Sequence, residues 1–122
     1  MVFLLIRMKD IHSLKNTSQL REVYEKGRSY ANSLLVVYAL AGDGEDQDQK
    51  LGISVSKKVG NSVVRHRITR LIRESFRMLR PNLSENCSII VVARVRAKDK
   101  NFSDICNAMR YLCRKLHVYT DS

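Results

Sequence analysis

The stretch KKVGNSVVRHRITRLIRESFRMLR, residues 57–80, decides how this 122-residue chain is organised. At about 100° per residue it predicts a helix with two unlike faces. The apolar face carries Val64, Ile68, Leu71, Ile72, Ser75 and Leu79. The opposite face carries Arg65, His66, Arg70, Arg73, Arg77 and Arg80. One side of such a helix packs on a core, and the other is left for an anionic partner.

The basic face is nearly free of acids. Residues 65–80 contain six arginines and one glutamate, and Lys57 and Lys58 stand just before them, so this region carries about +7 of the formal +10 of the chain. An ordinary solvated helix tends to alternate acids and bases four residues apart, whereas these bases repel one another. The guanidinium group forks onto phosphate oxygens and stacks on bases. The pattern therefore predicts an RNA-binding helix, with a merely solvated basic face as the alternative.

Bulk properties agree with this interpretation. The length and a hydrophobic content of 44 % suit one domain with a single core. An isoelectric point near 9.9 favours nucleic acid or an anionic membrane as partner. Membrane binding is disfavoured because the aliphatic side of the basic helix is needed for the core and the chain has no Trp.

Localisation follows from the N-terminus and the cysteines. The run MVFLLIRM, residues 1–8, is too short for a signal peptide or a bilayer span. Cys87, Cys106 and Cys113 are odd in number and lack the spacing of a zinc site. Cys113 and His117, four residues apart, could share a metal, but no second ligand pair accompanies them. We expect a cytoplasmic protein with buried thiols and no metal site of its own.

The remaining elements are expected as follows. Residues 17–26 form a helix with Asn16 as N-cap and Gly27 at its stop. Residues 34–40 and 50–56 form antiparallel neighbouring strands joined by a polar hairpin loop, whose acids at 43–48 do not match a calcium loop. Residues 88–95 form a buried strand parallel to 50–56. A last helix at about 103–118 buries Ile105, Ala108, Met109, Leu112 and Leu116.

Three segments carry a family resemblance. GISVSKKVGNSVVRHRITRLIRESFR, residues 52–77, resembles the signature of the bacterial ribonuclease P protein subunit, in which a strand, a Lys pair, a Gly-Asn turn and an Arg-Asn-Arg helix follow one another. LREVYEKGRSYAN, residues 20–32, resembles the first helix of that family, and SIIVVAR, residues 88–94, its last strand. One departure is His66, which stands where the family triplet has Asn.

The resemblance implies an α+β fold. The expected order is α-β-β-β-α-β-α in a single domain, a sandwich with a small mixed sheet. The family's crossover between parallel strands is left-handed, against the general rule that such connections are right-handed. Residues 13–119 would form the RNA-binding domain, and residues 1–12 an N-terminal arm.

The resemblance also assigns site residues. The RNA subunit would be bound by Arg65, His66, Arg67, Arg70, Arg73 and Arg77. The single-stranded 5′ leader of precursor tRNA would lie in a cleft with Tyr24, Tyr38, Lys57, Lys58 and Leu20. Leu20 stands where the family often has a second aromatic, and a core tyrosine remains the alternative for Tyr38. The turn at Gly60-Asn61 and the following helix end form a natural phosphate site.

No catalytic site is evident. The sequence shows neither a nucleophile with its base nor a carboxylate cluster for two-metal phosphodiester cleavage. The resemblance implies instead that an associated RNA, holding Mg²⁺, removes the leader, and that ribonuclease P RNA and precursor tRNA are the partners, with no membrane and no obligatory protein partner. A ribosomal-type RNA scaffold and a protein-only nuclease are the alternatives.

Overall fold

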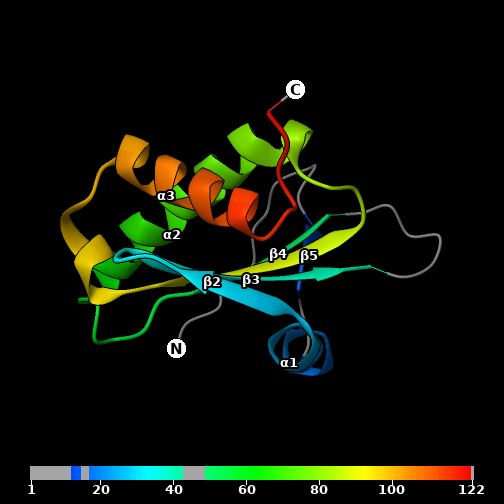
Figure 1. Cartoon of the computed structure of the whole chain (residues 1–122). Helices are drawn as coiled ribbons and strands as arrows, with labels where there is room; N and C mark the ends of the chain where they lie inside the picture. The colour runs from blue at the N-terminus through cyan, green and yellow to red at the C-terminus, as the bar shows by residue number, and fades with distance from the viewer. Residues whose placement is uncertain (1–11, 15–16, 43–48, 122) are drawn as a thin grey trace.

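The computed structural model describes residues 12–14, 17–42 and 49–121. A sheet has α1 on one face and α2 and α3 on the other (Figure 1). The strands are β1 (His12–Ser13), β2 (Arg28–Ala31), β3 (Leu35–Ala41), β4 (Lys50–Ser54) and β5 (Cys87–Ala93). The helices are α1 (Thr17–Lys26), α2 (Ser62–Leu79) and α3 (Phe102–Lys115), with 3-10 turns η1 (Arg80–Asn82) and η2 (Val95–Asp99). This arrangement confirms the expected α+β class.

The sheet has the order β1-β4-β5-β3-β2, with β5 in the centre. β5 pairs antiparallel with β3 and parallel with β4, which confirms the predicted parallel pair. The predicted hairpin between β3 and β4 is wrong, because both strands bond to β5 and not to each other. β5 carries the apolar run Ile89–Ala93, and such a run suits a central position in a sheet. The polar segment 43–48 lies outside the described residues.

The connection from β4 through α2 to β5 is a left-handed crossover (Figure 1), as the family resemblance implied. It places α2 on the same side of the sheet as α3, and the two helices pack against each other. We call the side that they cover the two-helix face. The opposite side is the α1 face, and its strand residues are Val36, Tyr38, Leu40, Lys50, Gly52, Ser54, Ser88, Ile90 and Val92.

The main core lies under the two-helix face. From α2 it takes Ile68, Ile72, Phe76 and Leu79, which are at most 1 % exposed. Phe76 follows Ile72 by one turn and belongs to this core, although the sequence interpretation did not place it there. Leu71, predicted as core, is only half-buried and packs at its margin. The five residues predicted for the last helix are all buried.

Side-chain caps fix the ends of the two covering helices. Asn61 caps α2 by accepting a hydrogen bond from the Val64 amide at 3.0 Å. Asn101 and Asp104 form a reciprocal capping box at the start of α3. At the other end of α2, Gln49 Nε2 donates to the carbonyls of Arg80, Leu83 and Ser84. These bonds satisfy backbone groups that a helix end leaves unpaired.

The helix α1 begins and ends where the sequence predicts, and Gly27 explains its end. A Cβ at Gly27 would lie 2.5 Å from the Val23 carbonyl oxygen and 2.8 Å from that of Ala39, so only glycine allows α1 to approach β3 this closely. The predicted cap Asn16 lies outside the described residues. The predicted arm also lies outside the described residues, apart from His12 of β1, which pairs with Lys50 of β4.

Candidate RNA-binding site

Most basic side chains of α2 form one band. At about 100° per residue, the outer surface of the helix carries a band that we call the basic stripe. Its members are Arg65, His66, Arg70, Arg73 and Arg77. His66, Arg70 and Arg77 are exposed, and Arg65 and Arg73 are half-buried. The structure thus brings together five of the six residues predicted to contact an RNA subunit.

The sixth residue, Arg67, points elsewhere. It lies on the flank of α2 that faces η2, and its guanidinium donates to the carbonyls of Lys98, at 3.2 Å, and Lys100. Part of its donor capacity is therefore used within the protein. Angular position along the helix already left Arg67 off the basic face, and only the family resemblance gave it the same role as its neighbours.

Little negative charge opposes the basic stripe. Glu74 lies 3.7 Å from Arg77, with both side chains about half exposed at 40 % and 55 %. An exposed pair of this kind contributes little to stability and leaves the arginine able to change partner. The stripe therefore presents a positive field that phosphate groups can neutralise.

The α1 face carries the second group of predicted residues. Tyr24 of α1 and Tyr38 of β3 meet edge to face, with ring centroids 4.7 Å apart and planes at 75°. Both rings are half-buried against a small cluster formed by Leu14, Val23 and Ile90. Burial, and then the neighbouring Tyr38, raise the pKa of Tyr24, so its hydroxyl stays protonated at neutral pH. The pair offers partly open aromatic surface next to hydroxyl donors.

Leu20 anchors α1 to the sheet. A Cβ at Gly52 would lie 3.3 Å from Leu20 Cδ2 and at the same distance from Leu14 Cδ1 and Ile90 Cγ1. The glycine therefore lets the helix settle directly on β4. Leu20 is half-buried in this contact. It therefore serves to pack α1 on the sheet, at the edge of the predicted cleft.

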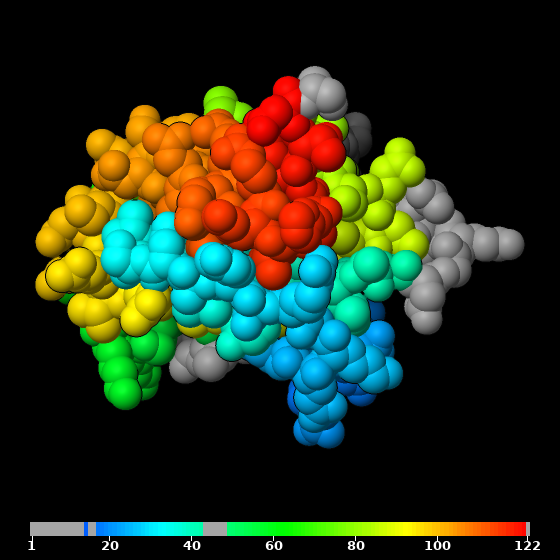
Figure 2. Space-filling view, viewed as in Figure 1, coloured from blue at the N-terminus to red at the C-terminus, as the bar shows by residue number. Residues whose placement is uncertain are grey.

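The Lys pair lies at the far end of the same face. Lys57 and Lys58 are exposed in the segment after β4, which the buried Val59 holds in place. Its backbone turns tightly, since the Val59 amide donates to the Ser56 carbonyl at 3.1 Å. This green segment and the blue α1 project from the same side of the sheet at opposite ends (Figure 2). The tyrosine pair and the Lys pair thus lie on the same side of the sheet.

Strand register identifies a floor that the sequence did not. Beyond Tyr38 toward the Lys pair, the next residues on the α1 face are Val36, Val92 and Ser54, which lie opposite one another in the sheet. The two valines are half-exposed. The Ser54 hydroxyl is buried and has no hydrogen-bond partner in the part of the chain that the structure describes. Side chains alternate between the two faces along a strand, so the sequence could have placed these three residues on one face if the central position of β5 had been known.

The described residues hold no group of three or more His, Cys, Asp and Glu side chains that could bind a metal ion. Cys113 is buried, and burial followed by the nearby Cys87 raises its pKa to about 12, so the thiol remains protonated. No helix in the described part of the chain combines the length and apolarity needed to cross a bilayer.

Comparison with known proteins gives a consistent result. The sequence model of the Ribonuclease P family matches residues 8–117. The ribonuclease P protein component of Lachnoclostridium phytofermentans is 51 % identical over 110 residues, covering 90 % of this chain and 92 % of that protein. The corresponding protein of Clostridium novyi is 41 % identical, with 92 % and 99 % covered. The solved structure of the Staphylococcus aureus RNase P protein superposes with a TM-score of 0.80 at 37 % identity, covering 89 % and 98 %.

Proposed function

This chain belongs to the ribonuclease P protein family, and we propose that as the protein component of bacterial ribonuclease P it binds both the RNA subunit and the 5′ leader of precursor tRNA. The basic stripe of α2 contacts the RNA subunit. The α1 face holds the leader. The enzyme then removes that leader to produce the mature 5′ end of the tRNA.

One observation carries the proposal: the two groups of predicted residues lie on opposite sides of one sheet. The basic stripe belongs to a helix on the two-helix face, whereas Tyr24 and Tyr38 lie on the α1 face. Two different RNA segments can therefore be held at once without competing. A simple RNA scaffold would need only the stripe and would have no use for half-exposed aromatic rings bordered by lysines.

The chemistry of each surface suits its RNA. Arginines without nearby acids suit the dense phosphates of a folded RNA. Aromatic rings suit unpaired bases, because every base has a face on which a ring can stack, whatever its identity. Leaders differ in sequence from one tRNA to the next, so a sequence-tolerant site is what a general processing enzyme requires.

The bond-breaking step belongs to the RNA subunit in this proposal. Mg²⁺ would be held mainly by the RNA. The protein acts by binding and positioning in the cytoplasm, where precursor tRNA is made, and needs no further protein partner.

Cleavage assays test the proposal. Precursor tRNA is incubated with the protein alone, with its ribonuclease P RNA alone and with both, at low and high Mg²⁺. We expect no cleavage by the protein, slow cleavage by the RNA at high Mg²⁺, and fast cleavage by the pair at low Mg²⁺. Cleavage by the purified protein alone would overturn the assignment of the chemistry to RNA. A pair no faster than the RNA alone would favour the scaffold alternative.

A further inference from the structure

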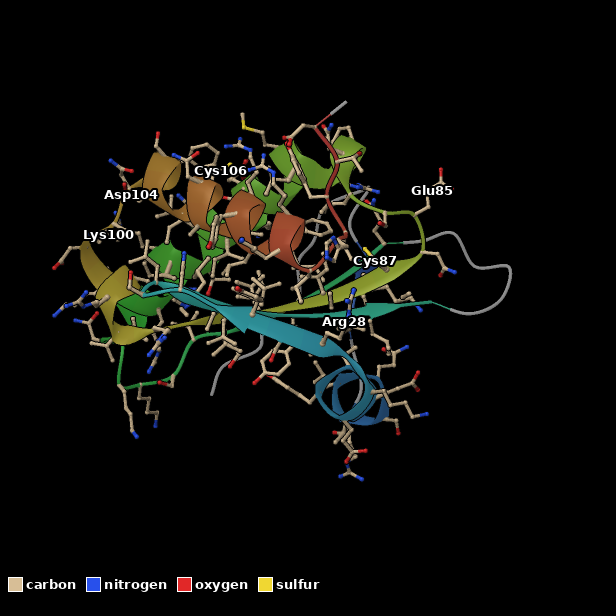
Figure 3. All side chains as sticks on the ribbon, in the orientation of Figure 1. Arg28, Glu85, Cys87, Lys100, Asp104 and Cys106 are labelled. Carbon is tan, nitrogen blue, oxygen red and sulfur yellow. The ribbon has the colours of Figure 1, made fainter. Side chains whose placement is uncertain are left out.

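The segment between β5 and α3 is a second concentration of positive charge. Residues 94–100, RVRAKDK, contain four basic side chains and one acid. They include η2, and we call them the η2 segment. The segment lies beside the N-terminal half of α2 and leads into α3, where Figure 3 labels Lys100.

The η2 segment is held firmly on three sides. Ala97 is fully buried and anchors the turn. On one side Arg94 donates from its amide to the Leu34 carbonyl and from Nη1 to the Asn32 carbonyl, both at 2.9 Å. On the other side Arg67 of α2 donates to the carbonyls of Lys98 and Lys100. A fixed backbone lowers the entropy lost when side chains bind, which favours a binding surface over a loose loop.

Its charged groups face solvent. Arg94, Arg96 and Lys98 are exposed, and Val95 is 57 % exposed between two of them. Arg94, Val95 and Arg96 line an open hollow together with Ser33 of the turn between β2 and β3. The nearby Asp104 is engaged in the capping box of α3, where it accepts from the Asn101 amide at 3.2 Å.

We propose that the η2 segment is a second contact surface for the phosphates of the ribonuclease P RNA, and that Arg67 is the positioning residue that joins it to the basic stripe. The inference rests on the proposed function. Packing of η2 on α2 makes the two basic surfaces continuous, so one folded RNA can bridge them. The aromatic pair lies on the other face of the sheet, which separates this surface from the leader.

Paired substitutions test the surface. Arg96→Gln with Lys98→Gln removes two exposed charges of the η2 segment. The control, Arg114→Gln with Lys115→Gln, removes two charges from the last turn of α3, where Arg114 also pairs with Asp121. The affinity of each variant for ribonuclease P RNA is measured across a salt series. Each lost phosphate contact should lower the slope of log K against log salt by about 0.7–0.9. We expect a drop of about 1.4–1.8 for the η2 pair and none for the control.

A third pair separates failure of this inference from failure of the proposed function. If Arg70→Gln with Arg73→Gln flattens the slope but the η2 pair does not, the η2 surface is refuted and the basic stripe stands. If no variant changes the slope, the proposed RNA contact itself fails. The same variants are titrated with precursor tRNA alone. An effect of the η2 pair there, without one on the RNA subunit, would assign the surface to the other RNA and overturn the proposal.

Arg67 is tested by a double-mutant cycle. If it positions the η2 segment, Arg67→Ala should reduce the effect of the η2 pair, because Arg96 and Lys98 no longer have a fixed backbone. Additive losses would show that Arg67 contacts RNA independently and would refute its positioning role. Unfolding curves measured alongside should stay close to the parent's, since Arg96 and Lys98 are exposed.

Discussion

The two faces of the sheet differ in how completely they are covered. Under α2 and α3, the strand residues Leu35, Val37, Leu51, Ile53, Ile89 and Val91 are at most 1 % exposed. On the α1 face, Val36, Tyr38, Leu40 and Val92 remain half-exposed, because a helix of ten residues covers only part of the same strands. Successive side chains of one strand therefore point to two faces that serve different purposes. One face stabilises the fold, and the other keeps surface free for a ligand.

The largest expected effect concerns the two-helix face. Ile72→Ala should lower the free energy of unfolding by about 2–5 kcal/mol, because it opens a cavity in a fully packed core. The neighbouring Leu71→Ala is the matched control and should cost about 1–2 kcal/mol, since Leu71 is only half-buried. Urea unfolding of the free protein measures both. Equal losses at the two positions would contradict the orientation of α2 on the sheet.

A substitution at Gly27 should damage the α1 face and spare the other. The added methyl group of Gly27→Ala would meet two carbonyl oxygens that cannot move aside, and overpacking of this kind costs about 1–3 kcal/mol. We expect hydrogen exchange to accelerate in α1 and β2 while α2 and α3 stay protected. Uniform loss of protection in all three helices would show that the two faces unfold as one unit.

Tyrosine substitutions test the ligand side of the comparison. Tyr24→Ala or Tyr38→Ala should weaken binding of leader-bearing precursor tRNA by the holoenzyme by about 1–3 kcal/mol, with little dependence on base identity. Mature tRNA, which has no leader, should bind unchanged. The variants should also lose part of the ring contact between them, so an unfolding curve accompanies each titration. Parallel weakening of both tRNAs by well-folded variants would favour the core alternative for these tyrosines.

Two buried thiols, Cys87 and Cys113, should have the smallest effect on the free energy of unfolding at neutral pH. Burial raises the pKa of Cys87 to about 11 and of Cys113 to about 12, from an ordinary 9.0. The unfolded chain therefore loses these protons at lower pH than the folded one, so stability is fully present below pH 9 and falls as pH rises toward 12. Cys113→Ala should make urea unfolding less sensitive to pH between pH 9 and about 10.5. An unchanged pH dependence would contradict the burial of this thiol.

The helices and the basic surface were predictable because their signals are local. The bounds of α1 and the buried positions of α3 follow from residue spacing and helix-end signals within a few turns. The arginines of the basic stripe could be grouped from angular position alone. The same local pattern could not separate Leu71 from Ile72, because both are apolar and only the tilt of α2 on the sheet decides which is covered.

Strand order was not predictable in this way, because pairing depends on partners far apart in the chain. Two neighbouring apolar runs suggested a hairpin, and nothing near them indicated that residues 87–93 would come between them. The floor residues Val36, Val92 and Ser54 were missed for the same reason. The η2 segment could not be linked to α2 from the sequence, because the hydrogen bonds from Arg67 to the carbonyls of Lys98 and Lys100 join residues about 30 positions apart.

The central place of β5 also has a consequence for how the protein is made. Synthesis proceeds from the N-terminus, so β3 and β4 leave the ribosome well before the strand that joins them. Until β5 is synthesised, β3 and β4 each have an unpaired edge of the kind that promotes aggregation. Pairing β5 with them requires contacts between residues far apart in the chain, and such contacts form slowly. α2 is synthesised during this interval, before the sheet on which its apolar side packs is complete. The basic stripe therefore takes its final place on the protein only after β5 has been synthesised.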